Sequence, residues 1–327
     1  MGRPEIAIDA ARALDNARAM GRNRAHPKGG DERIDGGLII PSVTPRFSIR
    51  PGETVFTIGS CFAREIEEAL KGFRIPTRDL HLDPDLVDGR PNSVLNEYNA
   101  GSMAQRIEWA ISGRDTTLIE GLTTAQEGGE VDLLLSKGRA VSRDRLMQVR
   151  GQIDEVYRAL PRADCVILTL GMTEVWLDNE TGLYLNRIPH PRELRRGGGR
   201  YSFVNLTAGE CFGQLARGIE KLRSGGVSKV LVTVSPVPLA ATFERRDCVI
   251  SNSFSKATLR VAADMLTREF DFVDYFPSFE IVQSGGLDSY QPDHIHVRPA
   301  VVQRIMRHLS ENYVGGGPVR AFWRRRG

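Results

Sequence analysis

Residues 53–73 read ETVFTIGSCFAREIEEALKGF, and they carry the strongest sequence signal for the fold. Its first half is an apolar run that breaks at Gly59 and Ser60. Its second half places apolar residues at the spacing of one helix face. The stretch therefore predicts a buried strand that runs into a helix through a two-residue turn.

The same alternation recurs along the chain, because three more apolar runs each follow a stretch with helical spacing. The runs are DCVILTLG at 164–171, SKVLVTVSP at 228–236 and FDFVDYFPS at 270–278, and the helical stretches are 143–160, 207–224 and 251–269. Unbroken Val, Ile and Leu runs between amphipathic helices favour a parallel sheet covered on both faces. With a further strand in IPTRDL at 75–80, we expect an α/β fold. It is a flavodoxin-like three-layer sandwich with about five parallel strands.

Several segments interrupt this repeat or lie outside it. The stretches 130–142 and 176–189 are predicted β-hairpin insertions, the second with its tip at 180–182. The Gly-rich, basic segment 192–202 is predicted to be a flexible loop, and residues 5–20 could form a short amphipathic helix. The predicted organisation is an N-terminal extension over 1–44, partly flexible, one domain over 45–314 and a basic C-terminal tail over 315–327.

Composition excludes several classes of protein. The chain has 327 residues, of which 41% are hydrophobic, and this suffices for one large core. Forty-four Lys and Arg against 41 Asp and Glu leave a net charge of +3, so the body of the protein is not built to neutralise a nucleic-acid backbone. The four cysteines form no CxxC pair, and no GxGxxG, Walker A lysine or HExxH occurs. We expect no metal or organic cofactor.

The sequence also bears on the cellular compartment. Widely spaced cysteines beside apolar residues indicate a reduced chain. The N-terminus lacks the continuous apolar core of a signal peptide, and no run of 18 apolar residues is present to span a bilayer. We therefore expect a cytoplasmic protein without a membrane span, and the sequence does not indicate its oligomeric state.

Candidate catalytic residues follow the predicted strands, since ligands of open parallel sheets bind beyond the carboxyl ends of the strands. Ser60 comes directly after the first strand, at the start of a helix whose dipole favours an anionic intermediate. Asp293 and His296 stand three residues apart on a loop ahead of another helix. A carboxylate that orients an imidazole is what a serine nucleophile requires, so the three residues are a candidate triad.

Each of these residues also has a plainer interpretation. Ser60 is equally suited to be the N-cap of its helix, and Asp293 and His296 could be a cap and a surface residue. Cys61, at the same helix start, could be a thiolate nucleophile or a buried structural cysteine. His81 could reach the site or lie at the surface.

The run Gly59-Ser60-Cys61-Phe62-Ala63 resembles the signature of the GSCFA family, a branch of the SGNH hydrolase-like proteins. Seven further blocks in the same order carry the resemblance over residues 45–312. They are LNEYN at 95–99, LTLGMTEVW at 168–176, FVNLT at 203–207, VTVSPVPLAATF at 232–243, SNSFSKATLR at 251–260, YFPSFEIV at 275–282 and DHIH at 293–296.

The resemblance implies roles for particular residues. Ser60 matches the serine of the first SGNH block, and Asp293 with His296 matches the DxxH of the last. Where typical SGNH enzymes have Gly-x-Asn-Asp, this chain has Gly171-Met172-Thr173-Glu174, with Thr173 at the position of the Asn that helps to bind the oxyanion. The Ser60 N–H with Thr173 or Asn99 would then bind the oxyanion.

Glu174 and Trp176 could line the substrate site, although an aromatic residue at a strand end usually belongs to the core. The expected activity follows from the same resemblance. The expected function is serine-dependent hydrolysis or transfer of an O-acyl ester, with an acylated small molecule or a carbohydrate as substrate. Whether water or an alcohol resolves the acyl-enzyme is left open. The alternative is a catalytically silent carbohydrate-binding or scaffold protein that keeps the fold.

Overall fold

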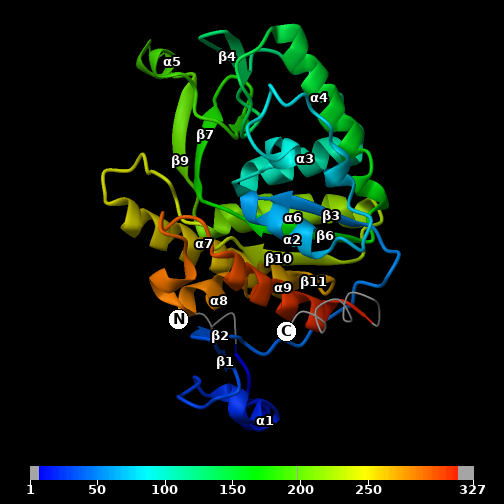
Figure 1. Cartoon of the computed structure of the whole chain (residues 1–327), viewed down its shortest axis with the longest axis vertical. Coiled ribbons are helices and arrows are strands. Elements are labelled where there is room, and N and C mark those ends of the chain that lie inside the picture. The colour runs from blue at the N-terminus through cyan, green and yellow to red at the C-terminus, as the bar shows by residue number, and fades with distance from the viewer. Residues whose placement is uncertain (1–6, 197, 316–327) are drawn as a thin grey trace.

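A parallel β-sheet forms the centre of the protein (Figure 1). The computed structural model describes residues 7–196 and 198–315. In the order of the sheet its strands are β11 (Val273–Tyr275), β10 (Val230–Val234), β6 (Cys165–Leu170) and β3 (Val55–Gly59). All three pairings are parallel, which confirms the predicted α/β class.

Helices cover both faces of this sheet because successive strand residues point to opposite sides. Phe56 and Ile58 of β3 lie in one apolar cluster, whereas Val55 lies in the other. Four helices contribute residues to the first cluster, namely α3 (Ala100–Ser112), α4 (Arg143–Tyr157), α6 (Ala208–Ser224) and α7 (Cys248–Glu269). The second contains α2 (Cys61–Ala69), α8 (Ser278–Ser284) and α9 (Pro299–Tyr313).

The predicted fifth strand, IPTRDL, is a 3-10 helix, η2 (Pro76–Asp79). The chain does start along the free edge of β3, where the Val55 N–H donates to the Arg74 carbonyl at 2.9 Å. Pro76 then fixes φ and has no N–H to donate to a ladder. The described part of the sheet consequently has four strands, and η2 lies where the fifth was expected.

The insertions form smaller antiparallel sheets beside the central one. The hairpin predicted at 176–189 is present as β7 (Glu174–Asp178) and β8 (Leu183–Leu185), and β9 (Tyr201–Asn205) pairs with the other side of β7. The hairpin predicted at 130–142 lies earlier, as β4 (Thr123–Gln126) and β5 (Gly129–Asp132). Within the predicted range lie the last three residues of β5 and an antiparallel bridge from Glu130 to Val141.

The flexible loop predicted at 192–202 is wrong where the structure describes a helix and a strand in this segment. Residues Pro191–Arg196 form helix α5, and the segment ends in β9. The basic run is a helix because Pro is favoured in the first turn and Arg in the last. The remaining short 3-10 helices are η1 (Gly21–Arg24), η3 (Pro91–Leu95), η4 (Thr116–Leu118), η5 (Leu160–Arg162) and η6 (Gly286–Ser289).

The N-terminal region contributes little to the core. Helix α1 (Ala10–Ala19), within the range where a helix was expected, has no buried residue. The chain first joins the apolar interior at Leu38, in the two-stranded hairpin of β1 (Ile34–Asp35) and β2 (Leu38–Ile39). Residues 1–6 and residues 316–327 of the predicted tail lie outside the described residues, and the boundaries of the extension and tail stay predictions.

Candidate active site

Three segments that the sequence singled out meet at the carboxyl edge of the sheet. Ser60 follows β3 directly, Gly171 follows β6 directly, and the 290–297 loop contacts the chain after β10, where Tyr290 Oη donates to the Pro236 carbonyl at 2.9 Å. A Cβ built on Gly171 would lie 3.4 Å from the Ser60 Cβ, so the first two segments touch.

The turn at Ser60 is tightly built. Gly59 has a φ of +148°, and a Cβ there would lie 2.3 Å from the Thr169 carbonyl oxygen, so no larger residue fits. The Ser60 N–H donates to the same carbonyl at 3.0 Å, which continues the ladder between β3 and β6. The Ser60 hydroxyl accepts from the Phe62 N–H at 3.3 Å as the N-cap of α2, and the residue is buried.

Asp293 and His296 form the pair that their spacing predicted. Nδ1 of His296 lies 2.6 Å from Oδ2 of Asp293, while Oδ1 accepts from the N–H groups of Ile295 and His296 at 3.0 Å. These bonds, that from the imidazole above all, lower the pKa of Asp293 to about 2. The loop turns back so that these backbone N–H groups reach Asp293, and within this turn His294 has a φ of +55°. The imidazole is fixed through Nδ1 and stays largely exposed.

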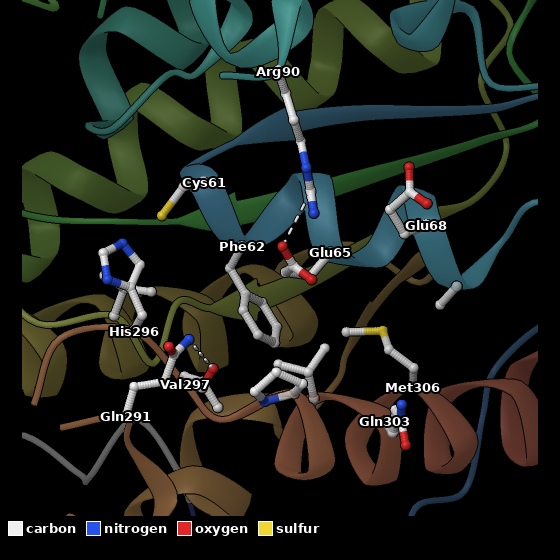
Figure 2. A pocket seen from close by; sticks show the side chains of 14 residues that line it. Cys61, Phe62, Glu65, Glu68, Arg90, Gln291, His296, Val297, Gln303 and Met306 are labelled. Carbon is white, nitrogen blue, oxygen red and sulfur yellow. Dashed lines mark hydrogen bonds and ion pairs between the residues drawn. The ribbon is translucent and has the colours of Figure 1, made fainter. Parts of the chain in front are cut away.

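A cavity of about 410 Å³ lies between α2 and the start of α9, and we call it the polar cavity (Figure 2). Its wall includes Cys61 and His296, which point to the same end in Figure 2, and the Arg90–Glu65 ion pair at 3.1 Å. Ser60 is next to this wall without being part of it. None of the hydrogen bonds within residues 7–196 and 198–315 joins Ser60 to His296.

The two other side chains considered from the sequence differ in environment. Cys61 lines the polar cavity, and burial raises the pKa of its thiol, which disfavours the thiolate. His81 is exposed on the segment after η2 and is not among the residues that line the polar cavity.

The predicted oxyanion donors are engaged elsewhere. Thr173 is buried, and its hydroxyl donates to Oδ1 of Asn205 at 2.6 Å. Asn99 caps α3, where its Oδ1 accepts from the Ser102 N–H at 2.8 Å. The Ser60 N–H is used by the sheet, as described above. An oxyanion role for Thr173 therefore stays a prediction, and it requires Oγ1 to turn away from Asn205.

A second cavity of about 360 Å³ is lined in part by Met172, the residue after Gly171, and we call it the aromatic cavity. Its wall includes Asn99, considered above as an oxyanion donor, and Glu174 and Trp176, considered as substrate contacts. Glu174 accepts there from the Thr242 hydroxyl at 2.5 Å and from the Phe243 N–H at 3.2 Å. These residues are thus brought together, but around a space distinct from the polar cavity.

Sequence reasoning missed Lys256, a fully buried lysine at this edge of the sheet. Its Nζ donates to the Gly171 carbonyl at 2.7 Å, and it is close enough to Cys61 for their charges to interact. Burial lowers the pKa of the amine to about 7. Its position three residues before Leu259, on the apolar face of α7, was the signal available in the sequence.

No group of three or more His, Cys, Asp or Glu side chains in the described part of the chain is arranged to hold a metal ion. Among the helices described, none is both long enough and apolar enough to cross a membrane.

Comparison with known proteins adds one assignment. A search of curated protein sequences finds no match. Among solved structures, the chain is similar to a catalytic mutant of Axe2, an acetylxylan esterase from Geobacillus stearothermophilus. The identity is 12%, the TM-score is 0.33, and 81% of this chain and 96% of that chain are covered. The model of the GSCFA family matches residues 54–309, which include Ser60, Gly171 and the Asp293–His296 pair, and the chain therefore belongs to the GSCFA family.

Proposed function

We propose that this protein hydrolyses or transfers an O-acyl ester, with Ser60 as the nucleophile and His296 as the general base. The observation that carries the proposal is the 2.6 Å hydrogen bond between Asp293 and Nδ1 of His296, on a loop that shares a cavity with the residue after Ser60. A carboxylate at Nδ1 fixes the tautomer whose Nε2 accepts a proton.

The reaction proceeds through an acyl-enzyme. The Ser60 hydroxyl turns from the Phe62 N–H toward His296, gives its proton to Nε2, and its oxygen bonds to the ester carbonyl carbon. His296 then returns this proton to the leaving alcohol as the C–O bond breaks. Water or a second alcohol then gives a proton to His296 as it attacks the acyl carbon, and His296 passes this proton to the Ser60 oxygen as the bond between that oxygen and the acyl carbon breaks. The N-terminus of α2 favours the anionic intermediate.

Ser60 is a better nucleophile candidate than Cys61 on electrostatic grounds. A cysteine reacts as the thiolate, and burial raises the pKa of the Cys61 thiol. A serine needs no ionised ground state, because a histidine removes its proton during attack. The resemblance to SGNH enzymes favours the same residue, and it supports an acylated carbohydrate or small molecule as the substrate class.

Labelling with a fluorophosphonate probe tests the proposal. We expect a stoichiometric adduct in the full-length protein and in Cys61→Ala, and none in Ser60→Ala, with hydrolysis of p-nitrophenyl esters following the same order. Loss of the nucleophile should lower the rate by about 10⁶-fold. Activity that survives in Ser60→Ala but not in Cys61→Ala would move the nucleophile to the thiol. No adduct and no turnover in any form would favour the silent binding protein.

A further inference from the structure

The aromatic cavity is built from segments that lie far apart in the sequence. Trp176 of β7 and Phe203 of β9 are cross-strand neighbours, and Phe243 comes from the loop between β10 and α7. The Trp176 and Phe243 ring centroids are 5.2 Å apart, and each ring is within 5.8 Å of Phe203. Phe243 is 50% exposed, so part of its ring remains accessible to solvent beside the other two aromatic side chains.

Polar side chains in this cavity have partners within the protein. Asn99 and Glu174 are bonded as described above, and Asn186 donates to Oε2 of Glu97 at 2.9 Å. The remaining three are Tyr98, which accepts from Asn96, Ser136, which donates to the Ser93 carbonyl, and Arg187, which donates to the Gly138 carbonyl. Because these polar groups are already bonded, the wall presents mainly apolar surface to a ligand. An apolar group therefore fits the aromatic cavity best.

The polar cavity differs in character. Figure 2 shows carboxylates, a guanidinium and two amide side chains around it, contributed by Glu65, Glu68, Arg90, Gln291 and Gln303. His296 lies in this wall. Apolar side chains, among them Phe62, Val302 and Met306, line the same wall, so its surface is mixed. Its charged and amide groups give a hydroxylated substrate group more hydrogen-bonding partners than the wall of the aromatic cavity does.

Ser60 lines neither cavity but is adjacent to a wall residue of one and in contact with the neighbour of a wall residue of the other. Cys61, the next residue, lines the polar cavity, while Gly171, in contact with Ser60, precedes Met172 in the aromatic one. The Met172 N–H donates to the Tyr98 carbonyl at 2.9 Å and fixes this boundary. A substrate whose carbonyl is held at Ser60 therefore extends one half to each side.

The role of His296 determines which cavity takes the alcohol and which takes the acyl group. His296 must give a proton to the leaving alcohol, so the alcohol lies on its side, in the polar cavity. The acyl group then points the other way. We propose that the aromatic cavity is the acyl-binding site and takes an apolar acyl group of several carbons or an aromatic ring. This inference rests on the proposed function, and it makes acetate a poor acyl group.

A chain-length series of p-nitrophenyl esters, from acetate to octanoate with phenylacetate added, tests the site. Because burying one methylene contributes about 0.8 kcal/mol, kcat/KM should rise about 4-fold per methylene until the cavity is full. Ala241, exposed in the wall of the cavity, is the residue to enlarge. Ala241→Trp should lower kcat/KM for hexanoate and phenylacetate at least 10-fold and leave acetate within about 3-fold. Ala257→Trp, an exposed position on α7 outside both cavities, is the matched control.

Octanoate binding to Ser60→Ala, measured by calorimetry, gives a readout without turnover. We expect binding in Ser60→Ala and its loss when Ala241→Trp is added. A Ser60-dependent esterase with flat chain-length dependence and no octanoate binding would overturn the acyl site and leave the proposed function standing. Octanoate binding blocked by Ala241→Trp, in a protein that hydrolyses no ester, would refute the proposed function and retain the cavity as a site for apolar carboxylates.

Discussion

Lys256 donates a 2.7 Å hydrogen bond to the carbonyl of Gly171, the residue that touches Ser60. No carboxylate forms an ion pair with this amine among the residues that the structure describes. A lysine that is buried and lacks an opposite charge is costly to keep protonated. Burial accordingly lowers the pKa of Lys256 to about 7, and the edge of the sheet behind the candidate nucleophile carries less positive charge as pH rises.

This amine gives protein stability a specific pH dependence. Between pH 7 and 10.5, the ordinary pKa of a lysine, Lys256 is protonated in the unfolded chain but not in the folded one, so the free energy of unfolding rises with pH in that window. Lys256→Met should flatten the rise, as measured by urea unfolding at several pH values. Lys221→Met, an exposed change on α6, should leave the slope unchanged. Equal slopes in the wild type and Lys256→Met would show that the amine stays charged.

The two histidines of the 293–296 loop should respond differently to substitution. His296→Ala removes the general base, and we expect kcat/KM to fall by about 10²-fold to 10⁴-fold. His294 contributes a backbone with a φ of +55°, so His294→Gly should keep activity, whereas the β-branched His294→Val should disturb the loop. The kcat/KM of each variant is measured on the same ester, and a thermal melt checks that each variant is folded. Equal losses in His296→Ala and His294→Gly would contradict the assignment.

Thr173 offers a test of the oxyanion site. If its hydroxyl turns from Asn205 to the oxyanion, Thr173→Val should lower kcat by about 10²-fold with little change in KM, and Thr173→Ser should retain activity. Asn205→Ala removes the partner in the structure but leaves the hydroxyl. It should cost stability rather than kcat. Identical kinetics in Thr173→Val and Asn205→Ala would instead mean that the hydroxyl only holds β9 in place.

Gly171→Ala tests how closely the segments at Ser60 are packed. The added Cβ would lie 2.7 Å from the Tyr98 carbonyl oxygen, and backbone there must move to admit it. We expect a lower melting temperature and a loss of ester turnover. Gly209→Ala, on α6 with nothing within 4 Å of its Cβ position, is the control and should change neither. Unchanged melting of Gly171→Ala would show that this contact can relax.

Much of the site was predictable where the contacts are local. The Asp293–His296 bond spans three residues, and the Ser60 turn joins a strand to the helix that follows it directly. Spacing alone favours such arrangements, because few backbone torsions separate the partners. The strands at 164–171 and 228–236 were predictable for a related reason, since burial on both faces leaves an unbroken apolar run.

The predictions were wrong for short segments in which two local signals favoured different structures. The apolar start of IPTRDL favoured a strand, but Pro76 removed the donor that a ladder needs. The glycines and arginines near residue 195 favoured a loop, yet the chain there begins a helix at Pro191. A single favourable cap or a single missing donor decides such short segments, and composition averaged over ten residues does not register it.

The order of residues along the chain was enough to predict that strands and helices alternate, that Ser60 follows a strand and that Asp293 and His296 pair. The hydrogen bonds of Thr173 to Asn205, 32 residues away, and of Lys256 to Gly171, 85 residues away, depend on the tertiary structure. It also assembled the aromatic cavity from β7, β9 and the loop after β10. Distant partners are selected by how whole elements pack, since a buried polar group must be satisfied by whatever the fold places beside it.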